Sequence, residues 1–332
     1  MESITLGTGG PRVSRVGLGL MGMSGVYGPA DEAESVATIH AALDAGVTMF
    51  DTGDFYGTGH NELLLRNALR SRSRASVFIG VKFGVQRDPG GALIGIDASP
   101  NAVKNSLAHT LTRLGTDYVD LYQPARLDPR VPIEETVGAI AEMIKAGYIR
   151  YLGLSEMGAA TIRRAHAVHP VTALQIEYSL MSRAIETEIL PCVRELGIGV
   201  TAYGVLSRGL LSTASAREIG AGDPRSRFPR FQGDNLRRNL DLLATLESIA
   251  AGHGVTTAQL AIAWVLSRGA DIVPLIGTKR RDRLAEALGA LAVELRPGEL
   301  AAIEAAVPQD QVAGDRYDPA SMSALDSEKP SV

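Results

Sequence analysis

The sequence predicts an α/β fold, a (β/α)8 TIM barrel with an N-terminal β-hairpin and a C-terminal loop. Strand-like segments alternate with amphipathic helical segments along the whole chain of 332 residues. The strand-like segments are apolar on both faces, which is typical of a parallel sheet covered by helices. No linker or break in composition interrupts this order, so we expect residues 1–332 to form a single barrel domain.

The order of helix, glycine and strand is clearest at DAGVTMFDTGD, KAGYIRYLGLS and ELGIGVTAYG. Each ends a helical segment at a glycine that can cap it, and each continues into four or five mostly apolar residues, as a buried strand would. Further strands are expected at VSRVGLGL, SVFIGVKFG, DYVDLYQ, VTALQIEY and DIVPLIG, which brings the number to eight. Between strands lie helices such as SPNAVKNSLAHTLTRLG, where Ser99 can cap the helix and Pro100 suits its first turn.

Three segments lie outside this alternation. Residues 3–18, SITLGTGGPRVSRVGL, predict a hairpin with its turn at residues 7–11. A longer insertion, residues 206–233, follows the seventh strand and precedes an amphipathic run at residues 235–251. The tail, residues 308–332, lacks periodicity, and we expect it to be a loop over one face of the barrel.

The composition indicates a globular protein, because 45% of the residues are hydrophobic and 21% are charged. A net charge of −4 gives no reason to expect nucleic acid or an anionic membrane as a partner. The chain shows no signal-peptide pattern and no apolar run near the length of about 18 residues that spans a membrane, so we expect a cytoplasmic protein. The single cysteine, Cys192, cannot form an internal disulfide. No His or Cys has metal-ligand spacing, and we predict no metal.

GLGLMG, residues 17–22, matches the GxGxxG pattern of Rossmann dinucleotide sites. That motif must open a helix at once, whereas Gly25, Gly28 and Pro29 block a helix here until about Asp31. We therefore interpret the segment as a barrel strand followed by a loop whose backbone can approach a ligand.

Functional residue types gather where the expected strands end, which in such a barrel is the face that carries the chemistry. In chain order these positions are Asp51, Lys82, Gln123, Ser155, Glu156, Gln175, Glu177, Tyr203, Gly277 and Thr278. Tyr56 follows Asp51 by five residues in DTGDFYG. The sequence therefore predicts a site at this rim.

Asp51, Tyr56 and Lys82 can act together in proton transfer. A phenol titrates near pH ~10, but an adjacent lysine ammonium favours the phenolate and lowers that pKa. Asp51 would orient the ammonium, and Tyr56 could then donate a proton to a carbonyl oxygen while a hydride attacks the carbon. A structural ion pair of Asp51 and Lys82, with Tyr56 as a loop anchor, accounts for the same residues equally well.

The order of motifs along the chain resembles that of the aldo-keto reductases. The motifs are DTGDFYG, GVKFG, DLYQPARLD, LGLSE, LQIEYSLMSR, YGVLSRGLL and IGTKRRDRLAEALGAL. The likeness covers essentially the whole chain and is strongest to the bacterial branch near the potassium-channel β-subunit-like and pyridoxal-reductase-like members. It implies NADPH-dependent reduction of aldehydes or ketones by a tetrad of Asp, Tyr, Lys and His. Asp51, Tyr56 and Lys82 would be the first three, with Tyr56 as the proton donor.

The fourth catalytic position falls on Ala125 in DLYQPARLD, where the family usually has histidine. A methyl group cannot donate to the substrate oxygen, and general acid–base residues typically contribute ~10² to 10⁴ in rate. We therefore expect weakened reduction and intact cofactor binding. An engineered His-to-Ala substitution explains the intact surroundings better than a natural loss of activity, which would more often bring several changes at once.

The resemblance also implies contacts to NADP(H). The expected cofactor-binding residues are Gly19, Met21, Asp51, Ser155, Gln175, Tyr203, Leu206, Arg208, Gly209, Gly277, Thr278, Lys279, Arg283 and Glu286. Ser155 and Gln175 would hydrogen-bond the nicotinamide carboxamide, and Tyr203 would stack on its ring. The basic segment TKRRDR, residues 278–283, would lie in the first turns of a helix and bind the adenosine 2′-phosphate, although a solvated helix face also accounts for its charges.

This sequence departs from the family in two further places. Glu156 stands where many relatives have Asn, and Ala287 stands where Asn often contacts the adenine. Tyr27, Phe55 and Phe83 are expected to shape the substrate site together with the insertion and the tail.

The function expected is therefore reduction of a small-molecule carbonyl substrate with NADPH. One alternative is an NADPH-binding regulatory or scaffold protein with little turnover, and another is a barrel enzyme that catalyses isomerisation or lyase chemistry without nicotinamide. The sequence leaves the substrate and the oligomeric state open.

Overall fold

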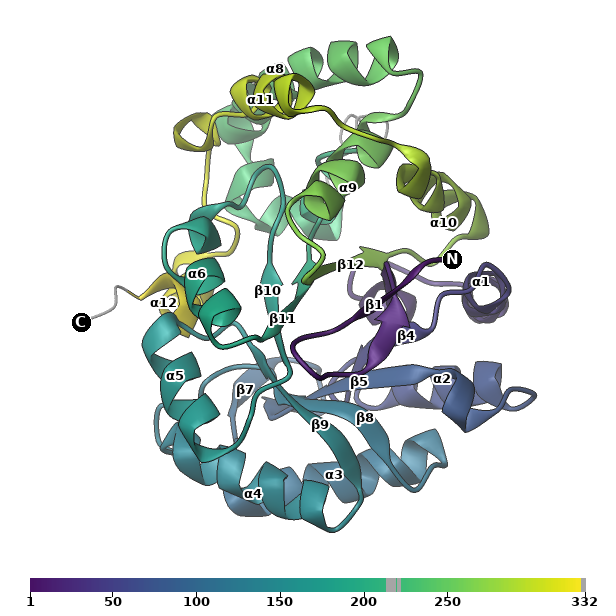
Figure 1. Ribbon diagram of the computed structural model, residues 1–332, viewed down its shortest axis with the longest axis vertical. Coiled ribbons are helices and arrows are strands. Elements are labelled where there is room, and N and C mark those ends of the chain that lie inside the picture. Colours follow the sequence, from purple (N-terminus) through teal and green to yellow (C-terminus); the bar gives the residue numbers. More distant parts are fainter. Residues whose placement is uncertain (213–218, 220–221, 330–332) are drawn as a thin grey trace.

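The computed structural model describes residues 1–212, 219 and 222–329. Within them, eight parallel strands close into a barrel in the order β10-β11-β12-β3-β4-β5-β8-β9, which confirms the predicted fold (Figure 1). The strands are β3 (Gly17–Gly19), β4 (Met49–Gly53), β5 (Phe78–Phe83), β8 (Val119–Pro124), β9 (Ile149–Ser155), β10 (Ala173–Glu177), β11 (Gly199–Tyr203) and β12 (Ile272–Gly277). Because they are parallel, their carboxyl ends meet on one face of the barrel.

Helices surround the barrel and connect its strands (Figure 1). They are α1 (Glu32–Asp44), α2 (His60–Leu69), α3 (Pro100–Leu114), α4 (Ile133–Lys145), α5 (Ala159–Val168), α6 (Ile189–Glu195), α8 (Gly233–Gly252), α9 (Thr257–Ser267), α10 (Arg281–Leu288), α11 (Pro297–Ala306) and α12 (Pro319–Ser323). The side chain of Asp31 caps α1, which therefore begins well after β3 ends at Gly19. A Rossmann motif would require an α-helix directly after that strand. No single helix in the described ranges is long and apolar enough to cross a membrane, although α8 and α9, bent by 86° at their junction, pass that test as a pair.

An antiparallel hairpin precedes the barrel, as predicted, and consists of β1 (Ser3–Thr5) and β2 (Arg12–Ser14). Its buried side chains Ile4, Leu6 and Val13 belong to the same apolar cluster as Met49 of β4 and Phe78 of β5. Because Met49 and Phe78 begin their strands, the hairpin covers the amino-terminal end of the barrel and leaves the opposite end for the site.

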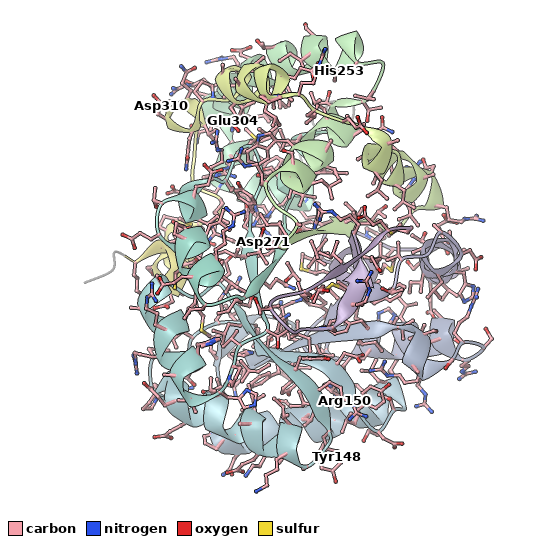
Figure 2. All side chains as sticks on the ribbon, viewed as in Figure 1. Tyr148, Arg150, His253, Asp271, Glu304 and Asp310 are labelled. Atoms are coloured by element: carbon pink, nitrogen blue, oxygen red, sulfur yellow. The ribbon has the colours of Figure 1, made fainter. Side chains whose placement is uncertain are left out.

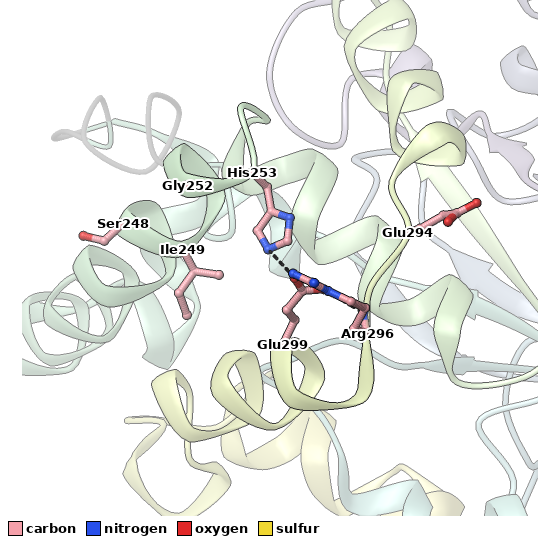
Figure 3. A pocket seen from close by; sticks show the side chains of 7 residues that line it. All are labelled: Ser248, Ile249, Gly252, His253, Glu294, Arg296 and Glu299. Atoms are coloured by element: carbon pink, nitrogen blue, oxygen red, sulfur yellow. Dashed lines mark hydrogen bonds and ion pairs between the residues drawn. The ribbon is translucent and has the colours of Figure 1, made fainter.

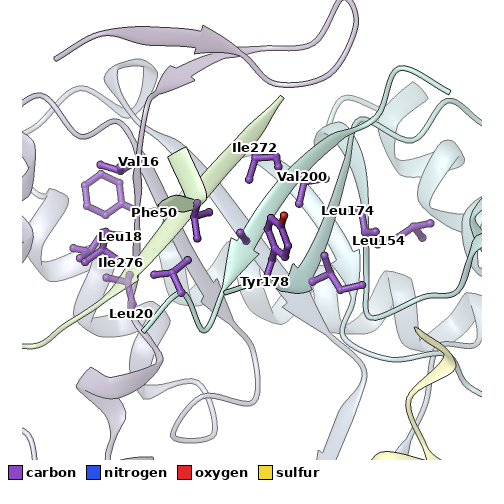
Figure 4. Packing of buried hydrophobic residues seen from close by; sticks show 14 of the residues in the cluster. Val16, Leu18, Leu20, Phe50, Leu154, Leu174, Tyr178, Val200, Ile272 and Ile276 are labelled. Atoms are coloured by element: carbon purple, nitrogen blue, oxygen red, sulfur yellow. The ribbon is translucent and has the colours of Figure 1, made fainter. Parts of the chain in front are cut away.

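Strand alternation divides the barrel residues into an outward-facing apolar set and an inward-facing set. The inward-facing set is apolar at the amino-terminal end, where Met49 and Leu121 lie, and mostly polar at the carboxyl end. Leu18, Phe50, Leu174, Val200 and Ile276 point outwards and pack in the main core between strands and helices (Figure 4). The indole of Trp264 on α9 is buried in this core, as predicted, and its N–H donates to the carboxylate of Glu304, 3.1 Å away. Glu304 lies on α11 (Figure 2).

Two segments differ from the expectation. A second hairpin was not predicted. It consists of β6 (Val85–Arg87) and β7 (Leu93–Ile96) and lies in the connection between β5 and α3. The tail contains the short helix α12 and a 3-10 turn at Asp326–Glu328 rather than loop throughout. Residues 213–218 and 220–221 of the predicted insertion, and 330–332 of the predicted tail, lie outside the described residues.

Candidate active site

Asp51, Lys82 and Gln175 meet inside the barrel, because each occupies an inward-facing position on its strand. The ammonium of Lys82 forms an ion pair with one carboxylate oxygen of Asp51. The other oxygen accepts a hydrogen bond of 2.6 Å from the side-chain amide of Gln175. All three side chains are buried. The predicted pairing of Asp51 with Lys82 is present, and Gln175 fixes the second oxygen of the carboxylate.

Tyr56 lies beside this cluster on the loop that follows β4. Its ring centroid is 5.2 Å from the Lys82 ammonium nitrogen, and Phe55 packs edge-on against it with ring centroids 4.8 Å apart. The residue is only 7% exposed, and within the described residues its hydroxyl makes no hydrogen bond. The phenol oxygen therefore has no partner in the described part of the chain, and the same is true of the buried side-chain amide of Gln123, which lies opposite Lys82.

The protonation of Tyr56 differs from the expectation. Burial and the negative charge of Asp51 raise the pKa of the phenol well above its ordinary value, although we expected Lys82 to lower it. Burial also lowers the pKa of Lys82, against the opposing influence of Asp51. The positive charge of Lys82 is paired with Asp51. Desolvation is therefore the largest influence on the pKa of Tyr56, and it raises that pKa.

Ala125 follows β8 in the wall of the site and is 1% exposed. Its backbone N–H donates to the carbonyl oxygen of Phe83, 2.9 Å away, which holds the end of β8 against β5. Phe83 itself is buried in the outer core and stacks on Tyr122 with ring centroids 4.4 Å apart. The expectation that Phe83 shapes the substrate site was wrong, because the inward position on β5 belongs to Lys82.

Glu156 directly follows β9 and is buried at the mouth of the barrel. It accepts hydrogen bonds from the Tyr203 hydroxyl at 2.6 Å, from Arg316 at 2.5 Å and from the Ser327 hydroxyl at 2.6 Å. Burial tends to raise the pKa of this carboxyl, but the Arg316 guanidinium and the other donors hold it at about 2. Glu156 therefore stays ionised and ties the C-terminal tail to the mouth, a role that the sequence did not indicate.

A second buried carboxylate, Glu177 of β10, orients the segment after β11. It lies 3.4 Å from Arg208, 3.6 Å from Arg230 and 3.4 Å from Arg316. Arg208 has a left-handed backbone with φ of 56°, as does its neighbour Ser207 with φ of 46°. Such conformations cost free energy and are common where a loop must present its backbone to a ligand.

The predicted cofactor residues surround a cavity of about 150 Å³ beside α10. Six of them line it, namely Leu206, Gly209, Gly277, Thr278, Arg283 and Glu286, and Ser212, Ala258, Ile276 and Ala287 complete the lining. Segments far apart in the sequence thus meet where the resemblance places a nucleotide. Ala287 faces the same cavity with a methyl group, where relatives often have Asn.

Strand pairing also brings together Gly19, Gly277 and Asp51. Gly19 of β3 is in register with Gly277 of β12 on one side and with Asp51 of β4 on the other. Met21 begins a 3-10 turn directly after β3, and Ser155 is buried at the end of β9. These predicted positions therefore all lie at the carboxyl face.

The basic segment of residues 278–283 is arranged differently from the expectation. Helix α10 begins at Arg281, so Lys279 and Arg280 precede it. The ammonium of Lys279 donates to the carbonyl oxygens of Gly28 and Pro29. Three ion pairs involve the arginines: Arg280 with Asp282 at 2.5 Å, Arg281 with Glu34 at 2.9 Å and Arg283 with Glu286 at 2.8 Å. Of these cations, Arg283 is the one that lines the cavity.

A larger surface cavity of about 600 Å³ lies between α8 and α11 (Figure 3). It is lined by Ser248, Ile249, Gly252, His253, Glu294, Arg296 and Glu299. The ring of His253 lies 3.7 Å from the Glu299 carboxylate. None of the predicted site residues lines this cavity, so size does not identify the candidate site here.

Sequence reasoning missed three charged residues near the mouth: Asp54, Arg126 and Arg316. Asp54 and Arg126 lie inside motifs that the sequence did offer, DTGDFYG and DLYQPARLD. Arg316 comes from the tail, where no periodicity predicts which side chain turns inwards.

Comparisons with known proteins agree with this geometry. The model of the aldo/keto reductase family matches residues 15–308. A probable aldo-keto reductase from Glycine max is 43% identical over 319 residues, which cover 96% of this chain and 92% of the relative. Among solved structures, a glycerol dehydrogenase from Gluconobacter oxydans matches with a TM-score of 0.85 and 28% identity, covering 96% of this chain and 98% of that one. A thermostable aldo-keto reductase in complex with the inhibitor epalrestat matches with a TM-score of 0.73 and 27% identity, covering 92% and 100%.

The closed barrel and the polar cluster at its carboxyl face define an oxidoreductase of the (β/α)8 class. The chain belongs to the aldo/keto reductase family.

Proposed function

We propose that this protein reduces aldehydes or ketones to alcohols with NADPH, and that Tyr56 is the proton donor. The observation that carries the proposal is the buried cluster of Asp51, Lys82 and Gln175 beside the phenol of Tyr56, which is itself buried and has no hydrogen-bond partner among the described residues. A structural ion pair needs no adjacent phenol, whereas proton transfer to a carbonyl oxygen needs a proton donor, which the phenol of Tyr56 can supply.

The residues around the small cavity fit a phosphorylated dinucleotide. Thr278 and Arg283 would hold the 2′-phosphate, Leu206 and Gly209 would cover the pyrophosphate, and Glu286 would contact the adenosine end. The cavity beside α10 supports this assignment, because these residues already share one space. Ser155, Gln175 and Tyr203 would hold the nicotinamide. When bound, NADPH supplies a hydride to the carbonyl carbon of the substrate.

The raised pKa of Tyr56 keeps its proton in place at neutral pH. A neutral phenol can donate a hydrogen bond to the substrate carbonyl and release the proton as charge develops on that oxygen. Lys82 then stabilises the phenolate that remains, and Asp51 holds Lys82 in position.

Substitution of Tyr56 tests the proposal. We expect Tyr56→Phe to lower kcat for aldehyde reduction by about 10² to 10⁴, the usual contribution of a general acid, with little change in the Kd for NADPH. NADPH oxidation with a panel of carbonyl compounds gives kcat, and quenching of protein fluorescence gives Kd. Full turnover by Tyr56→Phe, or no binding of NADPH to the unaltered protein, would contradict the proposal.

Ala125 favours a second candidate, a nucleotide-binding regulatory protein with little turnover. The methyl group cannot donate to the substrate oxygen, and we propose that reduction is impaired as a result. Restoring histidine with Ala125→His separates the candidates. A large gain in kcat supports an enzyme weakened at one position, whereas NADPH binding without any gain supports the binding protein.

A further inference from the structure

Four arginines bring positive charge to the mouth of the barrel: Arg126, Arg208, Arg230 and Arg316. The last three form ion pairs with the buried carboxylates of Glu156 and Glu177. Arg208 is further held between the rings of Phe228 and Tyr317, each about 4.5 Å from its guanidinium carbon. The charges of Arg208, Arg230 and Arg316 are therefore already compensated by carboxylates of the protein itself.

Arg126 has a different environment. Its Nη1 donates to the carbonyl oxygen of Ala125, the preceding residue, at 2.6 Å. Among the residues that the structure describes, no carboxylate forms an ion pair with it. The side chain is half-buried, so water compensates its charge only in part. The other N–H groups of the guanidinium remain available to a ligand.

The position of Arg126 places this guanidinium beside the reacting groups. It follows Ala125 at the end of β8, which pairs with β5 so that Gln123 is opposite Lys82. Burial and Asp51 raise the pKa of Tyr56, and the charge of Arg126 opposes them. The same charge acts on Glu156 across the mouth. Arg126 therefore lies close enough to the phenol that we assign as proton donor for its charge to act on that group.

We propose that Arg126 binds a carboxylate group of the substrate, so that the substrates of this protein are carbonyl compounds that also carry a carboxylate. The inference rests on the proposed function and specifies its substrate class. A guanidinium offers two parallel N–H groups that match a carboxylate, and such bonds strengthen where water is partly excluded. A phosphate dianion would favour a second uncommitted cation close to Arg126, whereas Arg208, Arg230 and Arg316 are each paired with a buried carboxylate.

A carboxylate bound by Arg126 would also compensate for the alanine at position 125. A histidine at that position would help to fix the carbonyl over the nicotinamide. With a methyl group there, a carboxylate held by the next residue can orient the substrate instead, because anchoring a remote group positions the reacting one.

Matched pairs of substrates test the proposal. The probes are ω-oxo carboxylic acids of increasing chain length, each compared with its methyl ester, which has the same carbonyl and no charge. We expect kcat/KM to favour the best acid over its ester on the order of 10- to 100-fold, as a charge-assisted hydrogen-bond pair supports. Arg126→Met should abolish this preference through a higher KM for the acid and change kcat/KM for the ester far less, while Arg126→Lys should retain part of the preference.

A distant arginine provides the control. Arg237 lies exposed on α8, and Arg237→Met should leave both substrates unaffected. Equal kcat/KM for acids and esters in the unaltered protein overturns the proposal, as does an equal loss on both substrates in Arg126→Met. Retained ester turnover by Arg126→Met also shows that the variant is folded.

Failure of the proposed function would give a different result. If no carbonyl compound is reduced, saturation-transfer NMR with the corresponding saturated carboxylates tests the site without turnover. Binding that disappears in Arg126→Met supports the carboxylate site, and no binding to either protein overturns it.

Discussion

Tyr56 and Asp54 lie two residues apart after β4, and burial raises the pKa of both. For Tyr56 the consequence is chemical, since a protonated phenol is the form that can donate. For Asp54 the consequence is a pKa of about 7, caused by burial and then by the negative charge of Glu62, against the opposing charge of Arg113. One oxygen of Asp54 is buried and has no hydrogen-bond partner among the described residues. The loop that carries Tyr56 therefore contains an acid that is costly to ionise.

This cost predicts a pH-dependent effect of Asp54→Asn. The pKa of Asp54 is raised by folding, so its favourable contribution is complete below pH 3.8 and is lost as the pH rises through about 7. The shift from 3.8 to about 7 corresponds to at most about 4 kcal/mol, at about 1.36 kcal/mol per unit. We expect Asp54→Asn to be more stable than the unaltered protein at pH 8 and about equally stable near pH 4, measured by urea unfolding.

The exposed Asp241 on α8 supplies the control, because Asp241→Asn should change stability equally little at both pH values. A stability difference for Asp54→Asn that stays constant between pH 4 and pH 8 would contradict the raised pKa.

At the scale of elements, buried charges help to fix the tail after α11 to the barrel, together with buried apolar side chains such as Leu325. Arg316 pairs with Glu156 and with Glu328, and the Glu156 side chain has no exposed surface. The N–H of Gly158 donates to Asp326 at 2.8 Å, which adds a second attachment at the amino terminus of α5. The tail thereby becomes a wall of the mouth.

Removing the cation should detach this wall. Arg316→Met leaves Glu156 charged and buried without its main partner, and breaking such a pair costs about 3–5 kcal/mol. We expect that loss in urea unfolding at pH 7, together with faster proteolysis after residue 308. The pKa of Glu156 is lowered by folding from 4.5 to about 2, so its stabilisation is complete above about pH 4.5 and is lost as the pH falls through about 2.

Two further variants isolate the buried charge. Glu156→Gln combined with Arg316→Met should be more stable than Arg316→Met, because no unpaired carboxylate remains. Arg163→Met breaks the exposed pair with Glu195 and should cost less than about 1 kcal/mol. Equal losses in Arg163→Met and Arg316→Met would show that the tail does not depend on its buried ion pair.

The elements that the sequence predicted are those with a local signal. Glycine caps and apolar runs mark the barrel strands, and Ser99 caps its helix as predicted. Helix α1 begins directly after Asp31, the position before which the glycines and Pro29 were expected to prevent a helix. The hairpin β6–β7 has no such signal, because its strands are mostly exposed and Leu93 and Ile94 face solvent. Arg316 could not be assigned, since its partner Glu156 lies 160 residues away in the sequence.

At the scale of the whole molecule, the two ends of the barrel have separate roles. The carboxyl end holds Asp51, Lys82 and Tyr56, and the amino-terminal end is covered by the hairpin β1–β2. The sequence predicted the site at the carboxyl end and the pairing of Asp51 with Lys82, because strand ends and alternation follow from local pattern. It predicted the hairpin as well, but not that the hairpin covers the opposite end. The predicted direction of the pKa shift of Tyr56 was wrong, because the shift depends on burial of the phenol, and that burial depends on how the whole mouth packs.

The division of roles predicts that damage to the hairpin lowers stability and spares the site. Leu6 has no exposed surface and packs with Met49 and Phe78 in the cluster that covers the amino-terminal end. Leu6→Ala should cost about 2–5 kcal/mol, the usual range for a buried leucine, measured by urea unfolding. The Kd for NADPH should not change under conditions where the variant is folded, because conserved function in these barrels lies at the opposite face. Leu63→Ala, at a side chain that is 49% exposed, is the matched control and should cost far less. Weaker NADPH binding by folded Leu6→Ala would show instead that packing at the covered end is transmitted through the strands to the mouth.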